Sequence, residues 1–310
     1  MKNNCCDFHD FYKKMKHLFQ TYFGSTMSYK QELEEKGYCV IEDILDTNEL
    51  KYARNSFDEW LNHNEQIKRL HDKISPHGIF KYLEVGQQKH AWYIRTRPKV
   101  QEVFKELWNT DALVVSFDGS CWISEEVKKK DNLWTHTDQA PNKKGLTCYQ
   151  GFVALTDNVK RSLVVYEGSH ILHEKYAEEK KLDSSKNWLL IEEEYLSRIA
   201  DKKRVLNVKA GSLVLWDSRT FHQNQYGGDC KEERIVQYIS FLPRSGLSQK
   251  MYEKRKKYFL TRRTTSHWAY PVKVNGLQPQ TYGNKALEID YSVLKPPELE
   301  DLMDDIMKIL

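Results

Sequence analysis

Three side chains, far apart in the chain, have the types and spacing of a mononuclear metal site. His136 and Asp138 stand two residues apart, and side chains at that spacing on a β-strand project from the same face. His222 follows much later, just beyond the apolar run that ends at Trp216. Two imidazoles and one carboxylate on neighbouring strands make the facial triad that binds Fe(II) and leaves coordination positions open. A His-x-Asp pair alone fits an ordinary strand equally well, so the hypothesis depends on His222 reaching the same place.

An arginine and two further polar residues are candidates for binding a ligand beside these three. Arg234 directly precedes an apolar run, and a guanidinium can hold a carboxylate through two parallel hydrogen bonds. Such an arginine is more often a surface ion-pair partner, but its position after His222 favours binding the far carboxylate of a dicarboxylic co-substrate. Asp118 and Gln150 are candidate substrate contacts, and an ordinary core role for Gln150 is equally compatible with its alternation with Phe152.

Short apolar runs in the middle of the chain supply the strands that would position these residues. The runs are β-branched or aromatic, and turn residues separate them. They lie between about Ala112 and Leu242: Leu113–Val115, Phe152–Leu155, Leu163–Tyr166, Leu213–Trp216 and Ile235–Phe241. This pattern predicts a mainly β core with flanking helices, built as an antiparallel sandwich or barrel.

The segments around this core differ from it in composition. Residues 1–110 are predicted to be mostly helical, with a short strand at Tyr38–Ile41 and a helix after Pro98. The core over 111–245 carries a charged, helical insertion at 172–201, too polar to lie inside. Residues 246–310 form a basic, irregular extension that ends in a short amphipathic helix. With 310 residues, the prior is one decorated domain over 1–310.

The overall composition bounds the class of protein. Hydrophobic residues at 40% and charged residues at 30%, with a net charge of +4, indicate a globular chain with mixed charge. No apolar run reaches the ~18 residues of a membrane span. The charged first residues do not fit a signal peptide, so we expect an intracellular, cytoplasmic location with a nuclear one still open. The cysteines form no Cys-x-x-Cys pair and are expected to be reduced thiols: Cys5, Cys6, Cys39, Cys121, Cys148 and Cys230.

A basic run at Lys250–Arg263 leaves the partner class open. Its lysines and arginines are interleaved with Tyr252, Tyr258 and Phe259, which could stack on bases while the cations contact phosphates. A solvated helix face is the commoner explanation of such a run. The sequence gives no indication of oligomeric state.

In these features the chain resembles the phytanoyl-CoA dioxygenase-like (PhyH) family of Fe(II)- and 2-oxoglutarate-dependent oxygenases. The similarity runs from about residue 31 to 244 and rests on ordered blocks rather than on one motif. These blocks are Glu34–Ile41, His136–Asp138, Phe152–Asp157, Leu163–His170 and Gly211–Trp216, followed by His222 and Arg234. The resemblance implies a double-stranded β-helix core, the cupin-like jelly roll.

The resemblance also assigns roles to individual residues. His136, Asp138 and His222 would hold the iron, and Arg234 would bind the C5 carboxylate of 2-oxoglutarate. Phe152 matches an aromatic position that lines the co-substrate, and Asn224 stands where family members commonly have a hydroxyl residue. An asparagine amide can still donate a hydrogen bond there. His170 and His173 are left to an ordinary structural role.

The implied reaction is hydroxylation of an organic substrate by O2 and 2-oxoglutarate, with release of succinate and CO2. Related halogenases have a small residue at the carboxylate position, so Asp138 favours hydroxylation. Two rivals remain: a jelly-roll binding module without turnover, and a cupin-like metal enzyme that uses no 2-oxoglutarate. Pocket walls in this fold come from the N-terminal segment, the insertion and the C-terminal region. A small molecule is the favoured substrate, with a nucleic acid or protein substrate as the alternative.

Overall fold

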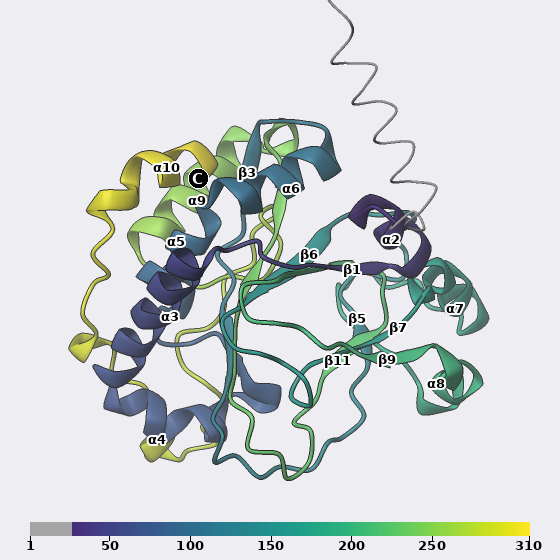
Figure 1. Cartoon of the computed structure of the whole chain (residues 1–310), viewed down its shortest axis with the longest axis horizontal. Coiled ribbons are helices and arrows are strands. Elements are labelled where there is room, and N and C mark those ends of the chain that lie inside the picture. Colours follow the sequence, from purple (N-terminus) through teal and green to yellow (C-terminus); the bar gives the residue numbers. More distant parts are fainter. Residues whose placement is uncertain (1–26) are drawn as a thin grey trace, which may run out of the picture.

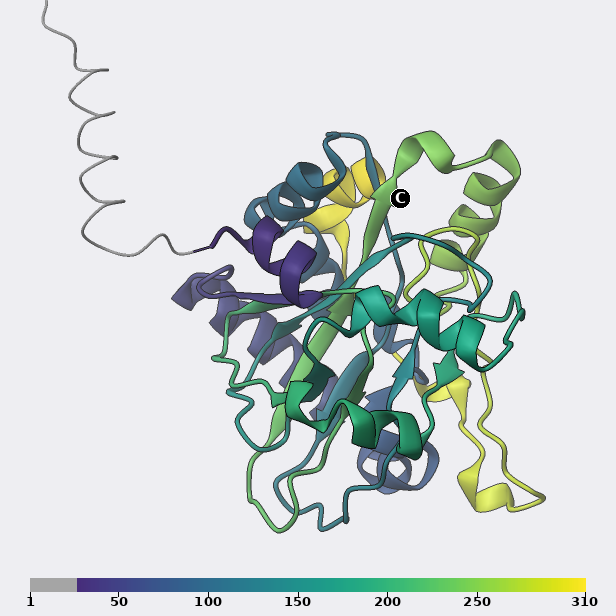
Figure 2. The ribbon, with the colours of Figure 1, turned by 90° about the vertical axis from the view of Figure 1, so that its right-hand side faces the viewer.

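Two facing antiparallel sheets form the core of the computed structural model, which describes residues 27–310 (Figures 1 and 2). The larger sheet has six strands in the order β1 (Tyr38–Ile41), β10 (Leu213–Asp217), β6 (Tyr149–Ala154), β12 (Arg234–Ile239), β4 (Ser120–Ile123) and β2 (Ile79–Phe80). The smaller sheet has the order β8 (Leu189–Leu190), β5 (His136–Thr137), β11 (His222–Asn224), β7 (Leu163–Tyr166) and β9 (Lys203–Val205). A separate pair joins β13 (Phe241–Pro243) to β3 (Leu113–Val115). This is the β-sandwich of the predicted jelly roll.

The two faces of the larger sheet pack against different partners. Along β12, Val236 and Tyr238 belong to the apolar cluster between the two sheets, whereas Ile235 and Ile239 belong to the cluster beneath the helices. This alternation follows from the two-residue period of a strand. Burying each aliphatic side chain contributes about 1.5–3 kcal/mol, so both interfaces stabilise the sheet that carries the site.

Helices from the first third of the chain cover the outer face of the larger sheet (Figure 1). They are α3 (Thr47–Asn62), α4 (Glu65–Ile74), α5 (Lys89–Arg95) and α6 (Pro98–Trp108), preceded by α2 (Tyr29–Lys36). Asp46 starts α3 because its carboxylate accepts the backbone N–H groups of Asn48 and Glu49. Gly37 ends α2 at a φ of +81°, and a Cβ there would lie 2.4 Å from Nδ1 of His170.

The insertion at 172–201 is only partly helical, which corrects the prediction. It contains α7 (His173–Glu179) and α8 (Glu193–Arg198), but β8 lies between them and pairs with β5. Tyr176 and Tyr195 are buried against Phe221, just before the central strand β11 of the smaller sheet. The charged residues therefore cover an apolar base that docks the insertion beside the core.

The C-terminal extension is more regular than the sequence indicates. Residues Gln249–Leu260 form α9, and the chain ends with α10 (Met303–Ile309), which buries Ile306 and Ile309 as expected of the amphipathic tail. Arg255 of α9 is fully buried, and its guanidinium donates to the backbone carbonyls of Leu310, Ala269 and Val115. One cation of the basic run thus serves to join three segments.

Two more cations of that run make internal contacts. Arg262 pairs with Glu84 at 2.6 Å, and Arg263 donates to the carbonyl of Asn275 at 2.7 Å. The solvent-exposed basic surface is therefore smaller than the run of sequence letters indicates, although Lys254 and Lys257 remain exposed.

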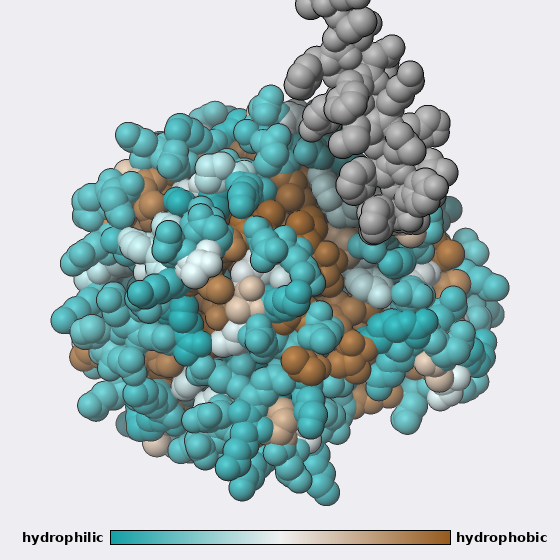
Figure 3. All heavy atoms as spheres, viewed as in Figure 1, coloured by the Kyte–Doolittle hydropathy of each residue, from teal (hydrophilic) through white to brown (hydrophobic). Residues whose placement is uncertain are grey.

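The surface and the thiols agree with the composition. Figure 3 shows one face covered mainly by hydrophilic residues, with apolar side chains gathered in a band across its middle. Within residues 27–310, no helix combines the length and apolar composition needed to cross a bilayer. Cys39, Cys121, Cys148 and Cys230 are free thiols. Cys5 and Cys6 lie outside the described residues, as do the charged first residues on which the expected location rests.

Candidate metal and co-substrate site

The smaller sheet brings the two candidate histidines face to face. His136 on β5 is the cross-strand partner of His222 on β11, and their ring centroids are 4.4 Å apart. Each strand is also paired on its other edge, β5 with Leu190 and β11 with Val165. Both imidazoles are only 5% exposed, so neighbours on both sides fix their positions.

Hydrogen bonds determine which ring nitrogen of each histidine is free to bind a metal. Nδ1 of His136 lies 3.0 Å from the carbonyl of Trp134, and Nδ1 of His222 lies 2.9 Å from the carbonyl of Thr220. A carbonyl oxygen can only accept, so each Nδ1 carries the proton. The lone pair is therefore on Nε2 of both rings, the arrangement typical of metal-ligating histidines.

Asp138 completes the group immediately after β5. Its backbone N–H donates to the carbonyl of Ser218, which holds the turn. Its carboxylate oxygens lie 3.8 Å from Nε2 of His136 and 3.4 Å from Nε2 of His222. One potential ligand atom from each residue lies within 4.8 Å of the other two. With metal–ligand bonds of about 2.1 Å, a small contraction would bring all three around one ion.

Gln150 holds the carboxylate in place. Its amide Nε2 donates to Oδ2 of Asp138 at 2.9 Å. Gln150 lies on β6, opposite Trp216 of β10. A side chain of the larger sheet thus holds the carboxylate of Asp138, which follows a strand of the smaller sheet. Gln150 also lines the cavity, so its predicted contact with substrate stays a prediction beside this hydrogen bond to Asp138.

The electrostatic environment favours the protonation states in which Asp138 and His136 can bind a metal cation. Burial opposes ionisation of Asp138, but His267, His136 and His222 favour it more strongly, so the pKa of this carboxyl lies well below its usual range. Burial, reinforced by His222, lowers the pKa of His136 to about 4. At neutral pH the carboxylate is charged and the His136 imidazole is neutral, which are the metal-binding forms of both groups.

Arg234 lies deeper between the sheets, on the inner face of β12. It is fully buried: Nε donates to Oδ1 of Asn158 at 3.1 Å, and Nη1 lies 3.7 Å from Sγ of Cys121. The guanidinium stands 5.4 Å from the ring centroid of Phe152. Its Nη2 has no hydrogen-bond partner among the described residues. A buried guanidinium with an unused donor fits a carboxylate ligand.

Three side chains lie between this arginine and strand β11, which carries His222. Asn224 Nδ2 donates to the hydroxyl of Tyr238 at 2.9 Å and lies 3.9 Å from Sγ of Cys121, which in turn contacts Arg234. Arg234 and Phe152 themselves do not line the open cavity, whereas Asn224 and Tyr238 do. Sequence reasoning missed Tyr238, although its position four residues after Arg234 places both on one face of β12.

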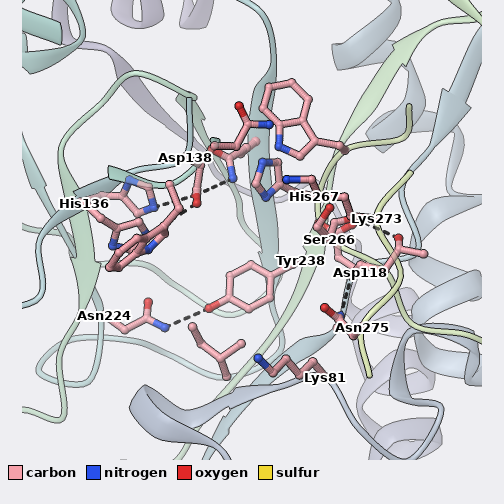
Figure 4. A pocket seen from close by; sticks show the side chains of 18 of the residues that line it. Lys81, Asp118, His136, Asp138, Asn224, Tyr238, Ser266, His267, Lys273 and Asn275 are labelled. Carbon is pink, nitrogen blue, oxygen red and sulfur yellow. Dashed lines mark hydrogen bonds and ion pairs between the residues drawn. The ribbon is translucent and has the colours of Figure 1, made fainter. Parts of the chain in front are cut away.

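A cavity of about 370 Å³ opens next to the candidate ligands (Figure 4). As expected, its walls come from the N-terminal segment, the insertion and the C-terminal extension, represented by Phe80, Trp188 and the stretch from Thr265 to Asn275. His136 and Asp138 lie on one side, and Asp118, Ser266 and Asn275 lie on the other. The volume is in the range of small-molecule sites.

Some residues that line the cavity could be predicted from the sequence, and others could not. Asp118, a predicted substrate contact, lines the cavity, and burial raises its pKa to about 7 against the opposing effects of Ser116 and Arg95. His170 and His173 do not line it; their Nε2 atoms face the carbonyls of Glu34 and Gln139. The overlooked His267, Trp268 and Trp188 lie in segments without a periodic pattern, so only tertiary packing reveals them.

Comparison with known proteins agrees with this geometry. The family model described as phytanoyl-CoA dioxygenase (PhyH) matches residues 33–225. The chain is 30% identical over 258 residues to "Ava biosynthesis cluster protein O" of Aspergillus versicolor, which covers 74% of this chain and 82% of the relative. The chain therefore belongs to the PhyH family, whose members are Fe(II)- and 2-oxoglutarate-dependent oxygenases.

Two solved structures are similar to this chain. The epimerase SnoN, in complex with Fe3+, alpha ketoglutarate and nogalamycin RO, has a TM-score of 0.50 at 18% identity, over 69% of this chain and 82% of that chain. A structure of EctD from S. alaskensis with 2-oxoglutarate and 5-hydroxyectoine has a TM-score of 0.49 at 15% identity, over 72% of this chain and 78% of that chain. The first of these supports the jelly-roll assignment.

Proposed function

We propose that this chain hydroxylates a small organic molecule, with consumption of O2 and 2-oxoglutarate and release of succinate and CO2. In this proposal His136, Asp138 and His222 hold Fe(II), and Arg234 binds the C5 carboxylate of 2-oxoglutarate. The observation that carries it is the convergence of two Nε2 lone pairs and one ionised carboxylate beside a cavity. Three protein ligands leave positions open for a bidentate oxo acid and O2.

Within this proposal, each neighbouring residue has a physical task. The bound iron and 2-oxoglutarate supply the oxidative chemistry. Arg234 has one nitrogen fixed by Asn158 and another free to donate to the co-substrate. Phe152 provides an apolar surface beneath that guanidinium. Gln150 keeps Asp138 oriented, and Trp188, whose ring lies 5.7 Å from that of His136, lines the cavity beside the candidate ligands.

The proposal extends to substrate class and location. The relative named for a biosynthesis cluster and the cavity of about 370 Å³ support a small molecule as substrate. The exposed lysines of α9 are the feature left to support a nucleic-acid or protein substrate. Buried free thiols such as Cys39 and Cys148 support a reducing, intracellular compartment.

We also propose that the chain forms a single oxygenase domain. The cavity takes residues from the N-terminal part, the jelly-roll core and the C-terminal extension. Removing any of these parts would remove a wall of the site.

Anaerobic assembly tests the proposed function directly. Purified protein with Fe(II) and 2-oxoglutarate should develop the weak visible charge-transfer band of the chelate, and admission of O2 should release succinate. A non-catalytic binding module would show no succinate above a protein-free control. A metal enzyme without 2-oxoglutarate would show neither the band nor any dependence on Arg234.

A further inference from the structure

A buried carboxyl group, that of Asp118, lies at one end of the cavity. Asp118 lines the cavity and is 4% exposed, and its Oδ1 has no hydrogen-bond partner among the described residues. In Figure 4 it lies across the cavity from His136 and Asp138, with Tyr238 between them. Burial opposes ionisation of this carboxyl group, and a cationic ligand group in the cavity would favour the ionised form.

The nearest buried cation does not neutralise this carboxylate directly. Arg95 is fully buried, but its two Nη atoms donate to the backbone carbonyls of Gly86 and Asp118, the latter at 2.9 Å. Within residues 27–310 no ion pair forms to the Asp118 side chain at 4.0 Å or less. Arg95 therefore fixes the Asp118 backbone, and its charge favours the ionised carboxylate without a direct ion pair to it.

The backbone around Asp118 is tightly packed. A Cβ on Gly86 would lie 2.6 Å from the Asp118 carbonyl oxygen, and one on Gly119 would lie 1.9 Å from that of Phe80. Gln237 also donates to the Asp118 carbonyl, at 3.3 Å. A carboxylate mounted on such a support is preorganised to hold a ligand group in one place.

The rest of the lining suits an apolar or aromatic body that carries a positive charge. The aromatic lining residues are Phe80, Trp134, Trp188, Trp216, Tyr238 and Trp268. Aromatic faces attract organic cations and also pack against hydrocarbon. Lys81 and Lys273 line the cavity too, but both side chains are exposed, so water screens them far more than it screens Asp118.

We propose that the substrate is an organic cation, a protonated amine or guanidinium joined to an apolar body, with its charged nitrogen held by Asp118. The apolar body lies among the tryptophans and presents a C–H bond to the metal. This inference rests on the proposed function, because it assigns the substrate class of the same site.

Three probes of nearly equal size and different charge test the proposal. They are phenethylamine, its neutral counterpart phenethyl alcohol and the anion hydrocinnamate, each titrated against the anaerobic Fe(II)–2-oxoglutarate complex with tryptophan fluorescence as readout. The wild-type protein should bind the amine about tenfold more tightly than the alcohol, because only the amine forms a buried charged hydrogen bond with Asp118. Equal binding of amine and alcohol, or tighter binding of the anion, would overturn the proposal without any variant.

The variant Asp118→Asn keeps the shape of the side chain and removes its charge. It should bind the alcohol as before and lose the preference for the amine, while the charge-transfer band stays unchanged. Asp111→Asn is the matched control, because Asp111 is 95% exposed and does not line the cavity; it should keep the preference. An amine preference that survives Asp118→Asn, as it would if the amine bound the metal itself, contradicts the proposal.

The same experiment separates this inference from the proposed function. Absence of the charge-transfer band in the wild-type protein would refute the proposed function. The preference for the amine, measured on the metal-free protein, would still decide whether Asp118 binds a cation.

Discussion

His136 and His222 are direct cross-strand partners, and both turn the same ring nitrogen toward Asp138. The strand register alone sets the spacing of the two imidazoles, and the carbonyls of Trp134 and Thr220 set their tautomers. A slip of one residue in β11 would move His222 to the opposite face of the sheet. The candidate metal group is thus a consequence of sheet pairing rather than of a flexible loop.

Removing one of these imidazoles should strongly weaken iron binding. We expect His222→Ala to weaken Fe(II) affinity by roughly 100-fold or more, because a lost ligand costs more than the ~10–100-fold measured for outer-sphere partners. The measurement is anaerobic Fe(II) titration with the charge-transfer band as readout. His170→Ala is the comparison, since His170 faces the carbonyl of Glu34 and should keep its iron. Unchanged affinity in His222→Ala would exclude this histidine as a ligand.

Changing the buried arginine should impair co-substrate binding selectively. Arg234→Lys keeps the positive charge but loses the planar pair of donors, so KM for 2-oxoglutarate should rise about tenfold or more, with little change in Fe(II) affinity. Succinate formation against 2-oxoglutarate concentration measures it. Arg204→Lys, at an arginine on the exposed strand β9, serves as control. A wild-type KM in the Arg234 variant would favour the metal enzyme that uses no 2-oxoglutarate.

The sequence predicted those parts of the molecule that depend on local pattern. Leu113–Val115 and Leu163–Tyr166 are strands with the predicted bounds, because short β-branched runs fit a buried sheet. The approach of His136, Asp138 and His222 could be predicted as well, since strand alternation and family blocks both constrain it.

The parts that were not predicted depend on tertiary contacts. Two-residue strand β8 has too little sequence to show a period, yet its pairing with β5 brings Trp188 next to His136. Arg255 looked like one cation of a solvated run, because nothing local shows that three backbone carbonyls surround it. His267 and Trp268 could not be predicted for the same reason, since only the packing of the C-terminal extension brings them to the cavity.

Buried histidines make the protein sensitive to mild acid. His71 is 1% exposed, its Nε2 donates to the carbonyl of Trp122 at 2.7 Å, and burial lowers its pKa to about 4. Its unfolded pKa is near 6.5, so between these values the unfolded chain takes up a proton that the folded chain does not. The contribution of His71 to the free energy of unfolding is therefore complete above pH 6.5 and is lost as the pH falls. At pH 5 the loss from this residue is about 2 kcal/mol.

A variant isolates this contribution. His71→Gln retains a donor for the Trp122 carbonyl and cannot titrate, so the loss of unfolding free energy from pH 7 to pH 5 should shrink by about 2 kcal/mol. Urea denaturation at the two pH values measures it. Asn62→Gln, at an exposed residue that cannot titrate, should leave the pH dependence as in the wild type. An equally steep dependence in His71→Gln would show that the folded state tolerates the charged imidazole.

Arg255 should matter for stability and for the shape of the cavity at once. Arg255→Met preserves most of the side-chain volume but leaves the carbonyls of Leu310, Ala269 and Val115 without their donor, so we expect a loss of about 3 kcal/mol in the free energy of unfolding. Lys254→Met, one residue earlier on α9 and exposed, should change stability by no more than about 0.5 kcal/mol. Urea denaturation compares the two.

Because Ala269 lies between the lining residues Trp268 and Lys273, the Arg255 variant should also bind phenethylamine less tightly, measured by the same fluorescence titration. Equal stability of the two variants would mean that water replaces the guanidinium at these carbonyls without cost.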